Sequence, residues 1–125
     1  MRNNLITTNN TTETIVSMEV AMMIDRGHKE LLRDSRRYSN QIKKINETSG
    51  KSKIALSDFF QESTYISEQN KVLPCFNITR KGCEFIANKL TGQKGTEFTA
   101  RYVNRFHELE EGNITTTLLS SLNAL

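Results

Sequence analysis

The sequence predicts an α+β fold in one small domain, with N-terminal helices, then a β-hairpin and then two C-terminal helices. Three patterns predict it. Helical periodicity runs from about residue 28 to 46, strand-forming runs at 54–66 and 72–78 flank a polar turn, and two capped helical runs follow. A length of 125 residues suits a single domain. We divide the chain into a tail of residues 1–13, a domain of residues 14–111 and a tail of residues 112–125.

The N-terminal part is expected to hold one short strand and one short helix. Residues 1–13 are rich in asparagine and threonine and poor in apolar groups, which predicts disorder. Thr14-Ile15-Val16 suits an edge strand, and Ser17 is a favoured N-cap residue for the helix behind it. Gly27 is expected to take the positive φ that ends this helix.

The helix expected from about His28 to Asn46 has the clearest periodicity of the chain. Its apolar stripe comprises Leu31, Ser35, Tyr38, Ile42 and Ile45. Its opposite face carries Lys29, Arg33, Arg36, Arg37, Asn40, Lys43 and Lys44. From Lys29 to Lys44 there are six basic and two acidic residues, a net +4, whereas the whole chain carries +3. The positive charge is therefore concentrated on one helix face, with Glu30 and Asp34 between the two faces.

The hairpin is expected after a polar linker of residues 47–53. Asn70, in the turn, tolerates the left-handed conformation. Pro74 lacks an N–H group, which restricts the second strand to a sheet edge or a bulge.

Two helices are expected to follow the hairpin. Thr79 is a favoured cap for a helix that reaches about Leu90, and Thr96 for the last main helix. Thr91 to Gly95 reads as a tight loop between them, and Gly112-Asn113 is expected to stop the last helix.

The composition indicates a soluble protein without a membrane span or a secretory signal. No apolar run approaches the roughly 20 residues that cross a bilayer, and the N-terminus is polar. We therefore expect a cytoplasmic location. Two cysteines and two histidines match the spacing of no usual zinc site, so we expect Cys75 and Cys83 to be packed thiols, with no metal and no cofactor.

A short helix, a glycine turn, a basic helix and a hairpin follow one another in the order of a winged helix-turn-helix. The major groove of DNA admits one α-helix, and the flanking phosphates favour Lys and Arg. We assign base edges to Lys29 and Arg33, and a phosphate to His28 at the helix start. The candidate DNA-binding residues are His28, Lys29, Arg33, Arg36, Arg37, Asn40, Lys43, Lys44 and, at the hairpin tip, Lys71. Lys51 and Lys53 precede the hairpin and are placed to add backbone contacts.

DNA binding has two alternatives, a merely solvated basic face and an enzyme. A basic face on an amphipathic helix is often only a solvated surface. An enzyme needs a nucleophile, a base and an orienting group within hydrogen-bond reach, and Cys83 with His107 is the one pair to consider. Since Cys83 falls on the inward face of its helix, we expect no catalytic residue and no enzyme activity.

The C-terminal half also contains an unusual set of short sequence motifs. Its pieces are Phe59-Phe60, Ser63-Thr64-Tyr65, Thr79, Lys81-Gly82-Cys83-Glu84, Asn88-Lys89-Leu90-Thr91-Gly92, Lys94-Gly95, Phe98-Thr99-Ala100 and Tyr102-Val103-Asn104-Arg105-Phe106-His107. Less specific pieces upstream are Val16-Ser17, Glu19-Val20-Ala21, His28 and Leu31-Leu32-Arg33-Asp34. Together they resemble the phage regulatory proteins of the Rha family, over about residues 14 to 111.

The resemblance implies a phage or prophage transcriptional regulator that binds double-stranded DNA in the bacterial host cell, on the nucleoid. It also leaves an alternative, an antirepressor-type module that binds a phage repressor or host regulatory protein. The features that favour the alternative are the acidic Glu108, Glu110 and Glu111 and the apolar tail residues Ile114, Leu118, Leu119, Leu122 and Leu125. A second copy of the chain is a further expected partner, because a homodimer binds two half-sites of DNA and so gains affinity.

The chain departs from the Rha pattern in two ways. Many relatives carry a further C-terminal region, whereas this sequence ends at Leu125. Relatives also tend to have an apolar residue after the Arg-Asp pair, where this chain has Ser35-Arg36-Arg37. The second departure adds charge to the face assigned to DNA.

Overall fold

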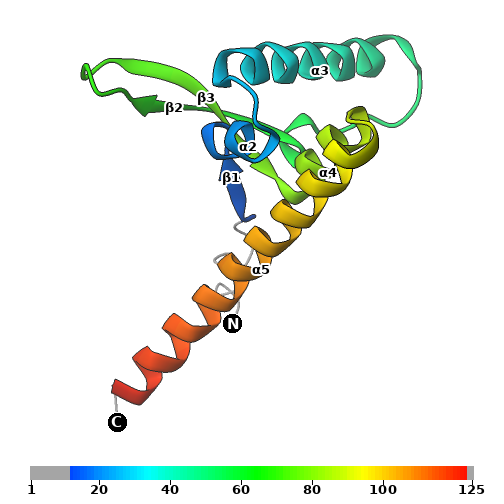
Figure 1. Cartoon of the computed structure of the whole chain (residues 1–125). Coiled ribbons are helices and arrows are strands. Elements are labelled where there is room, and N and C mark those ends of the chain that lie inside the picture. The colour runs from blue at the N-terminus through cyan, green and yellow to red at the C-terminus, as the bar shows by residue number, and fades with distance from the viewer. Residues whose placement is uncertain (1–11, 124–125) are drawn as a thin grey trace.

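The structure is a computed structural model that describes the backbone of residues 12–123 and the side chains of residues 12–112. Residues 1–11, which hold most of the tail predicted to be disordered, lie outside the described part. The elements, labelled as in Figure 1, are β1 (Thr14–Val16), α2 (Ser17–Ile24), α3 (His28–Thr48), the short 3-10 turn η1 (Leu56–Asp58), β2 (Phe60–Ile66), β3 (Val72–Thr79), α4 (Arg80–Lys89) and α5 (Gly92–Asn123). The predicted α+β arrangement is confirmed.

The three strands form an antiparallel sheet in the order β1-β3-β2. The hairpin pairs Phe60 with Ile78 at its base and Ile66 with Val72 near its turn. Pro74 lies in the central strand, so the prediction that its strand is an edge or bulge was wrong. β1 pairs only with Asn77 to Thr79 of β3, so at Pro74 the strand has β2 as its one neighbour and no second ladder needs the missing N–H.

The core lies where α2 and α4 pack on β3 and α5 packs against both of these helices. Its largest fully buried apolar side chains are Phe98 and Phe106 of α5, Ile78 of β3, Val20 of α2 and Cys83 of α4. Figure 1 shows α3 across the other end of the molecule, while α5 runs past the core and projects from it. The helical face of α5 around Phe98, Tyr102 and Phe106 anchors the N-terminal part of this helix to the core.

Tyr38 joins α3 to this core. Its ring centroid lies 5.2 Å from that of Phe85 in α4 and 6.4 Å from that of Phe60 in β2. Leu31 and Ile42 of the same helix face are also buried, whereas Ile45 is exposed. The predicted apolar stripe thus holds the helix through its first four turns, and the last turns extend beyond the core.

Both ends of α2 differ from the prediction. Val16 is the N-cap residue of α2, and Ser17 lies inside the helix with its hydroxyl buried. Asp25 takes the left-handed conformation at φ 59°, whereas Gly27 has φ −64°. Asp tolerates this region because its short polar side chain bonds locally, so the turn did not need the glycine that the prediction assigned to it.

The start of α4 was predicted correctly, whereas the start of α5 was not. Thr79 caps α4, since its Oγ1 accepts the N–H of Gly82 at 3.0 Å. α5 begins at Gly92, which has φ 61°, and not at Thr96, so the predicted loop to Gly95 is shorter than expected. Nor does Gly112 end the helix, because a glycine in a helix interior costs only about 1 kcal/mol and the backbone continues to Asn123.

Candidate nucleic-acid interface

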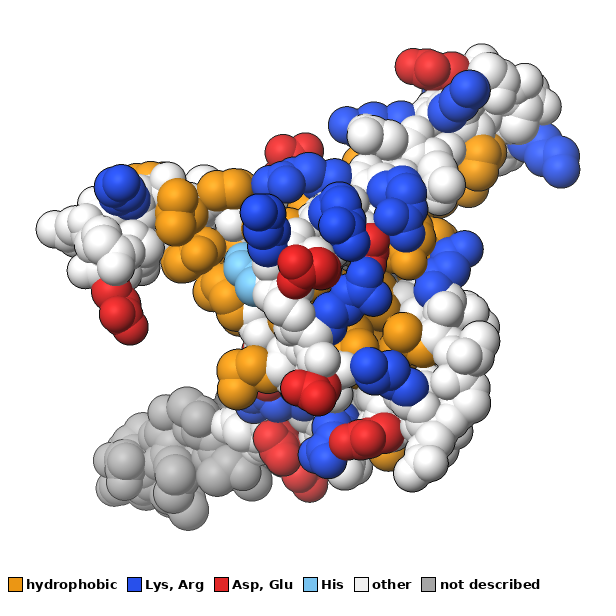
Figure 2. Space-filling model, turned by 45° about the horizontal axis from the view of Figure 1, so that its top comes forward, with side chains coloured by type: hydrophobic (Ala, Val, Ile, Leu, Met, Phe, Trp, Pro, Cys, Tyr) orange, Lys and Arg blue, Asp and Glu red, His pale blue; other side chains and the backbone are white. Residues whose placement is uncertain are grey.

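The exposed face of α3 gathers the positive charge of the molecule. All seven residues predicted on this face are exposed: Lys29, Arg33, Arg36, Arg37, Asn40, Lys43 and Lys44. Figure 2 shows Lys and Arg side chains crowding over this helix, with few carboxylates between them. The predicted one-sided distribution of charge is therefore present in three dimensions.

Asp34 divides these cations into two groups, which sequence reasoning missed. It is only 6% exposed and its carboxylate lies 2.7 Å from Arg26, 3.0 Å from Arg37 and 3.9 Å from Arg33. In the sequence, the only signal was that Arg37 stands three residues after an Asp on a helix. Asp34 was placed between the faces and is instead the buried anchor of three guanidinium groups.

The other cations of α3 have no such partner. Within residues 12–112, no carboxylate lies within 4.0 Å of the charged groups of Lys29, Arg36, Lys43 or Lys44. We call these four residues the unpaired cations. An unpaired, hydrated cation on a surface is available to an anion without the loss of an existing ion pair. These four side chains are the part of α3 best suited to bind phosphate.

His28 differs from the other predicted site residues because it faces inward. Its Nε2 lies 2.8 Å from the hydroxyl of Ser17, and that hydroxyl accepts the N–H of Phe76 at 3.0 Å. Its ring also meets the edge of Tyr65 at a centroid distance of 6.0 Å. His28 therefore fastens the start of α3 to α2 and to both strands of the hairpin, and this burial lowers the pKa of the imidazole.

The lowered pKa of His28 predicts a pH-dependent stability. Because the unfolded chain binds a proton near pH 6.5 and the folded chain binds it only at lower pH, the free energy of unfolding should fall as pH drops below about 6.5 through the folded pKa. Urea unfolding of the parent and of His28→Gln between pH 7.5 and 5.5 measures this. The difference between the two proteins should change with pH, whereas His107→Gln, at an exposed position, should keep the parent's profile. Parallel curves for His28→Gln and the parent contradict the prediction.

Lys71 lies at the hairpin turn, apart from the cations of α3. Asn70 has φ 64°, as the sequence predicted, and the N–H of Ser67 donates to the carbonyl of Lys71 at 2.8 Å. Figure 1 shows the hairpin reaching past the His28 end of α3. Lys71 is exposed there, beyond Ile66 and Val72, which are each 64% exposed.

The linker after α3 is tied back to the helix end. The side-chain amide of Asn46 accepts the N–H of Ile54 at 2.7 Å and donates to its carbonyl at 2.9 Å. Lys51 and Lys53 are exposed within this linker. The two lysines therefore lie on a segment held at the end of α3, which the composition of the linker did not indicate.

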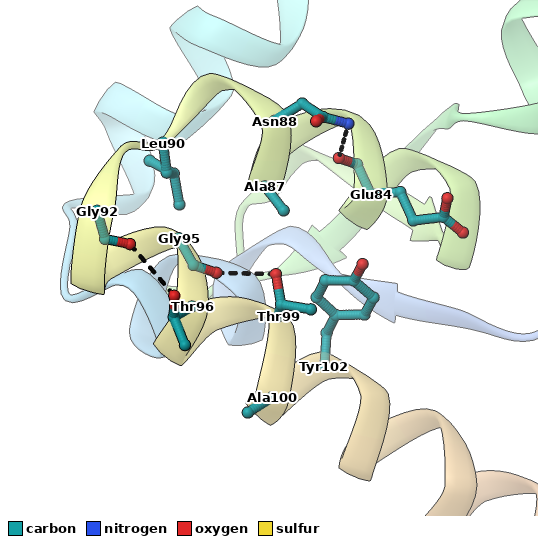
Figure 3. A pocket seen from close by; sticks show the side chains of 10 residues that line it. All are labelled: Glu84, Ala87, Asn88, Leu90, Gly92, Gly95, Thr96, Thr99, Ala100 and Tyr102. Atoms are coloured by element: carbon teal, nitrogen blue, oxygen red, sulfur yellow. Dashed lines mark hydrogen bonds between the residues drawn. The ribbon is translucent and has the colours of Figure 1, made fainter.

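A hollow of about 710 Å³ lies between α4 and the start of α5. Figure 3 shows the side chains of Asn88, Thr96 and Thr99 bonded to carbonyl groups of their own helices. Thr99 donates to the carbonyl of Gly95 at 2.8 Å, and Asn88 to that of Glu84 at 3.0 Å. These polar groups of the hollow are thus already engaged by the helices that carry them.

The described residues bring together no metal or thiol chemistry. Across the part of the chain that the structure describes, there is no cluster of three or more His, Cys, Asp or Glu that suits a metal ion. Burial raises the pKa of Cys83 to about 12, so its thiol stays protonated and unreactive. None of the described helices has the length and apolarity to cross a membrane.

Known proteins resemble this chain over most of its length. The family model described as phage regulatory protein Rha matches residues 15–111. A similar protein is YoqD of Bacillus subtilis (strain 168), derived from the SPbeta prophage, whose name describes it provisionally as an antirepressor. The two are 42% identical over 95 residues, which is 76% of this chain but 35% of YoqD. No solved structure matches the chain.

Proposed function

The chain belongs to the Rha family of phage regulatory proteins, and from this premise we propose that it regulates transcription by binding double-stranded DNA with α3 in the major groove. The unpaired cations on the exposed face of α3 are the observation that carries the proposal. They offer four positive charges to DNA from side chains that are exposed to solvent. A helix of this kind fits the major groove, with phosphates on either side.

The order of the elements supports the same role for α3. β1, α2, α3 and the β2–β3 hairpin follow one another in the order of a winged helix-turn-helix, and His28 of α3 contacts Tyr65 of the hairpin. In helix-turn-helix proteins the second helix enters the groove with its N-terminal residues on base edges. Here that helix is α3, and its exposed N-terminal residues Lys29 and Arg33 are the proposed base readers.

Arg33→Ala and Lys44→Ala should affect DNA binding in different ways. Arg33 is proposed to contact a base edge, so its loss should cost about 1–3 kcal/mol on the preferred sequence and little on other DNA. Lys44 is proposed to contact phosphate, so its loss should weaken binding to all sequences and lower the slope of log K against log salt by about 1. Fluorescence anisotropy over a salt series, on one selected and one random duplex, measures both.

The same titrations test the proposed function itself. Lys81→Ala is the control, because Lys81 is exposed on α4 and is not one of the proposed DNA-binding residues. If Arg33→Ala and Lys44→Ala bind DNA as Lys81→Ala does, α3 is not the reading helix. If the parent protein binds no duplex at physiological salt, the DNA-binding function is wrong.

A second function, an antirepressor that binds a repressor or host factor, is favoured by the name of the relative YoqD. The acidic residues Glu108, Glu110 and Glu111 are exposed on α5. The apolar residues at 114–125 lie where side chains are not described. Retention of a phage repressor on the immobilised protein, with no affinity for DNA, would favour this function over the first.

The proposal contains no catalytic step and no cofactor. It places the protein in the bacterial cytoplasm, on the nucleoid when it is bound to DNA. A homodimer suits it, because one helix-turn-helix makes few contacts and two half-sites together strengthen binding.

A further inference from the structure

A small hollow lies where α2, α3 and α4 meet. Its volume is about 240 Å³. The buried side chains of Ile24, Leu31 and Ile86 line its apolar part. Its polar lining comes from Arg26, Asp34, Arg37 and Lys89. Only Arg37 of these was expected to bind DNA.

Contacts with Asp34 and Tyr38 position the three cations of the hollow. Asp34 binds Arg26 at 2.7 Å and Arg37 at 3.0 Å, so one buried carboxylate fixes two guanidinium groups. Cζ of Arg37 and Nζ of Lys89 lie over the aromatic ring of Tyr38, at 5.2 Å and 5.6 Å from its centroid. Three positive charges and one negative charge leave a formal +2 at the hollow.

The excess charge is what an anion needs. The side chains of Arg26 and Arg37 are still 38% and 53% exposed while they contact Asp34. Each guanidinium group has five N–H donors, so donors remain after the bonds to Asp34. Lys89 is exposed and, among residues 12–112, has no carboxylate within 4.0 Å of its ammonium group. A group with several acceptor oxygens, such as phosphate, matches this set of donors.

The position of the hollow on α3 relates it to the DNA-facing side. Arg37 follows His28 by nine residues, which at about 100° per residue is about 900°, or two turns and a half. The two side chains therefore lie on opposite flanks of the helix. His28 contacts Tyr65 on the hairpin flank, and Arg37 contacts Asp34 and Tyr38 on the flank of the hollow.

We propose that Arg26, Arg37 and Lys89 form a site for one phosphate group on the flank of α3 opposite the hairpin. The source to which we commit is the DNA backbone, and this choice of source rests on the proposed function. A helix in the major groove has a phosphate strand on each side. The hairpin with Lys71 lies toward the phosphates of one DNA strand, and the hollow meets those of the other DNA strand. Arg26 and Lys89 thus become DNA contacts outside α3.

The first arm of the test uses inorganic phosphate and does not depend on DNA. Isotope-labelled protein is titrated with phosphate, and the side-chain Nε–H signals of Arg26 and Arg37 are followed by NMR. Saturable shifts are expected in the parent and in Lys81→Gln, which removes a charge from the same helix outside the hollow. They should be lost in Lys89→Gln. The same spectra establish that each variant is folded.

The second arm measures DNA binding of the same three proteins over a salt series. Lys89→Gln should lower the slope of log K against log salt by about 0.9 and weaken binding at 0.15 M salt about fivefold, equally on selected and random duplexes. Lys81→Gln should match the parent. A neutral methylphosphonate placed at the phosphate beside the hollow should weaken the parent and leave Lys89→Gln unchanged, a result that mere loss of packing at Lys89 would not give.

The outcomes separate this site from the proposed function. Phosphate shifts together with the lowered slope establish the site and its DNA source. Shifts with an unchanged slope overturn the DNA source and leave a site for a free phosphate group. DNA binding by the parent without shifts and without a slope change at Lys89 overturns the site alone. Shifts in a parent that binds no DNA overturn the proposed function and its phosphate source, and keep the site.

Discussion

Replacing the unpaired cations of α3 together with glutamine is expected to weaken DNA binding about 10³-fold at 0.15 M salt. The variant carries Lys29→Gln, Arg36→Gln, Lys43→Gln and Lys44→Gln. Arg36, Lys43 and Lys44 are the proposed phosphate contacts, and each contributes about 0.9 to the slope of log K against log salt, about 2.7 together. At 0.15 M salt this amounts to roughly 170-fold. Loss of the base contact proposed for Lys29, worth about 1 kcal/mol, supplies the remaining factor of about five. Since these side chains are exposed and have no ion pair among the described residues, the fold should keep its stability.

Anisotropy titrations from 0.05 to 0.3 M salt measure this effect. A matched pair separates position from net charge. Lys43→Gln with Lys44→Gln should lose about 30-fold at 0.15 M salt, and Lys81→Gln with Lys94→Gln, which removes the same charge elsewhere, should lose little. Equal losses in the two double variants would mean that DNA senses only the net charge of the protein, which contradicts an interface on α3.

Gly82→Ala is expected to destabilise the protein by about 3 kcal/mol, although alanine is the better helix former. A Cβ atom at this position would overlap the carbonyl oxygen of Phe59 and lie 2.7 Å from Cγ2 of Ile78. The same Phe59 carbonyl accepts the N–H of Thr79 at 3.2 Å, so it is fixed at the start of α4. The added methyl group must therefore push α4 away from the sheet.

Gly112→Ala is the control for that experiment. Nothing lies within 4 Å of a Cβ atom built at Gly112, and the residue is inside α5. The substitution should stabilise the protein by up to about 1 kcal/mol. Urea unfolding of both variants gives the free energies. A stable Gly82→Ala protein would show that α4 does not pack against Phe59 as described.

The fold could be predicted from the sequence where local signals and burial agree. The periodicity around Leu31 and Tyr38 placed α3, and its basic face followed from the same helical geometry. Thr79 was recognised as a cap because its hydroxyl accepts an N–H group of the helix that directly follows it. In these cases neighbours along the chain determine the structure, so sequence spacing is enough.

The rest depends on partners that are distant in sequence. The sequence predicts Ser17 as a cap, but its hydroxyl accepts the N–H of Phe76, 59 residues away. Asp34 reads as a residue between two helix faces, but Arg26 from the preceding turn joins Arg37 on its carboxylate. Lys89 reads as the end of α4, and only packing brings it over the ring of Tyr38. Sequence periodicity gives the face of a helix, but not what another element places on its edge.

Selection of DNA from a genome tests most directly the central claim, that α3 binds specific DNA. The immobilised protein is mixed at 0.15 M salt with sheared genomic DNA of the bacterium that carries its gene, and the retained fragments are sequenced. We expect the parent to enrich a few discrete fragments, since specific sites exceed non-specific DNA by at least about 10³ in affinity. The variant without the four unpaired cations should enrich none. Enrichment of no fragment by the parent, or of the same fragments by both proteins, would contradict DNA recognition through α3.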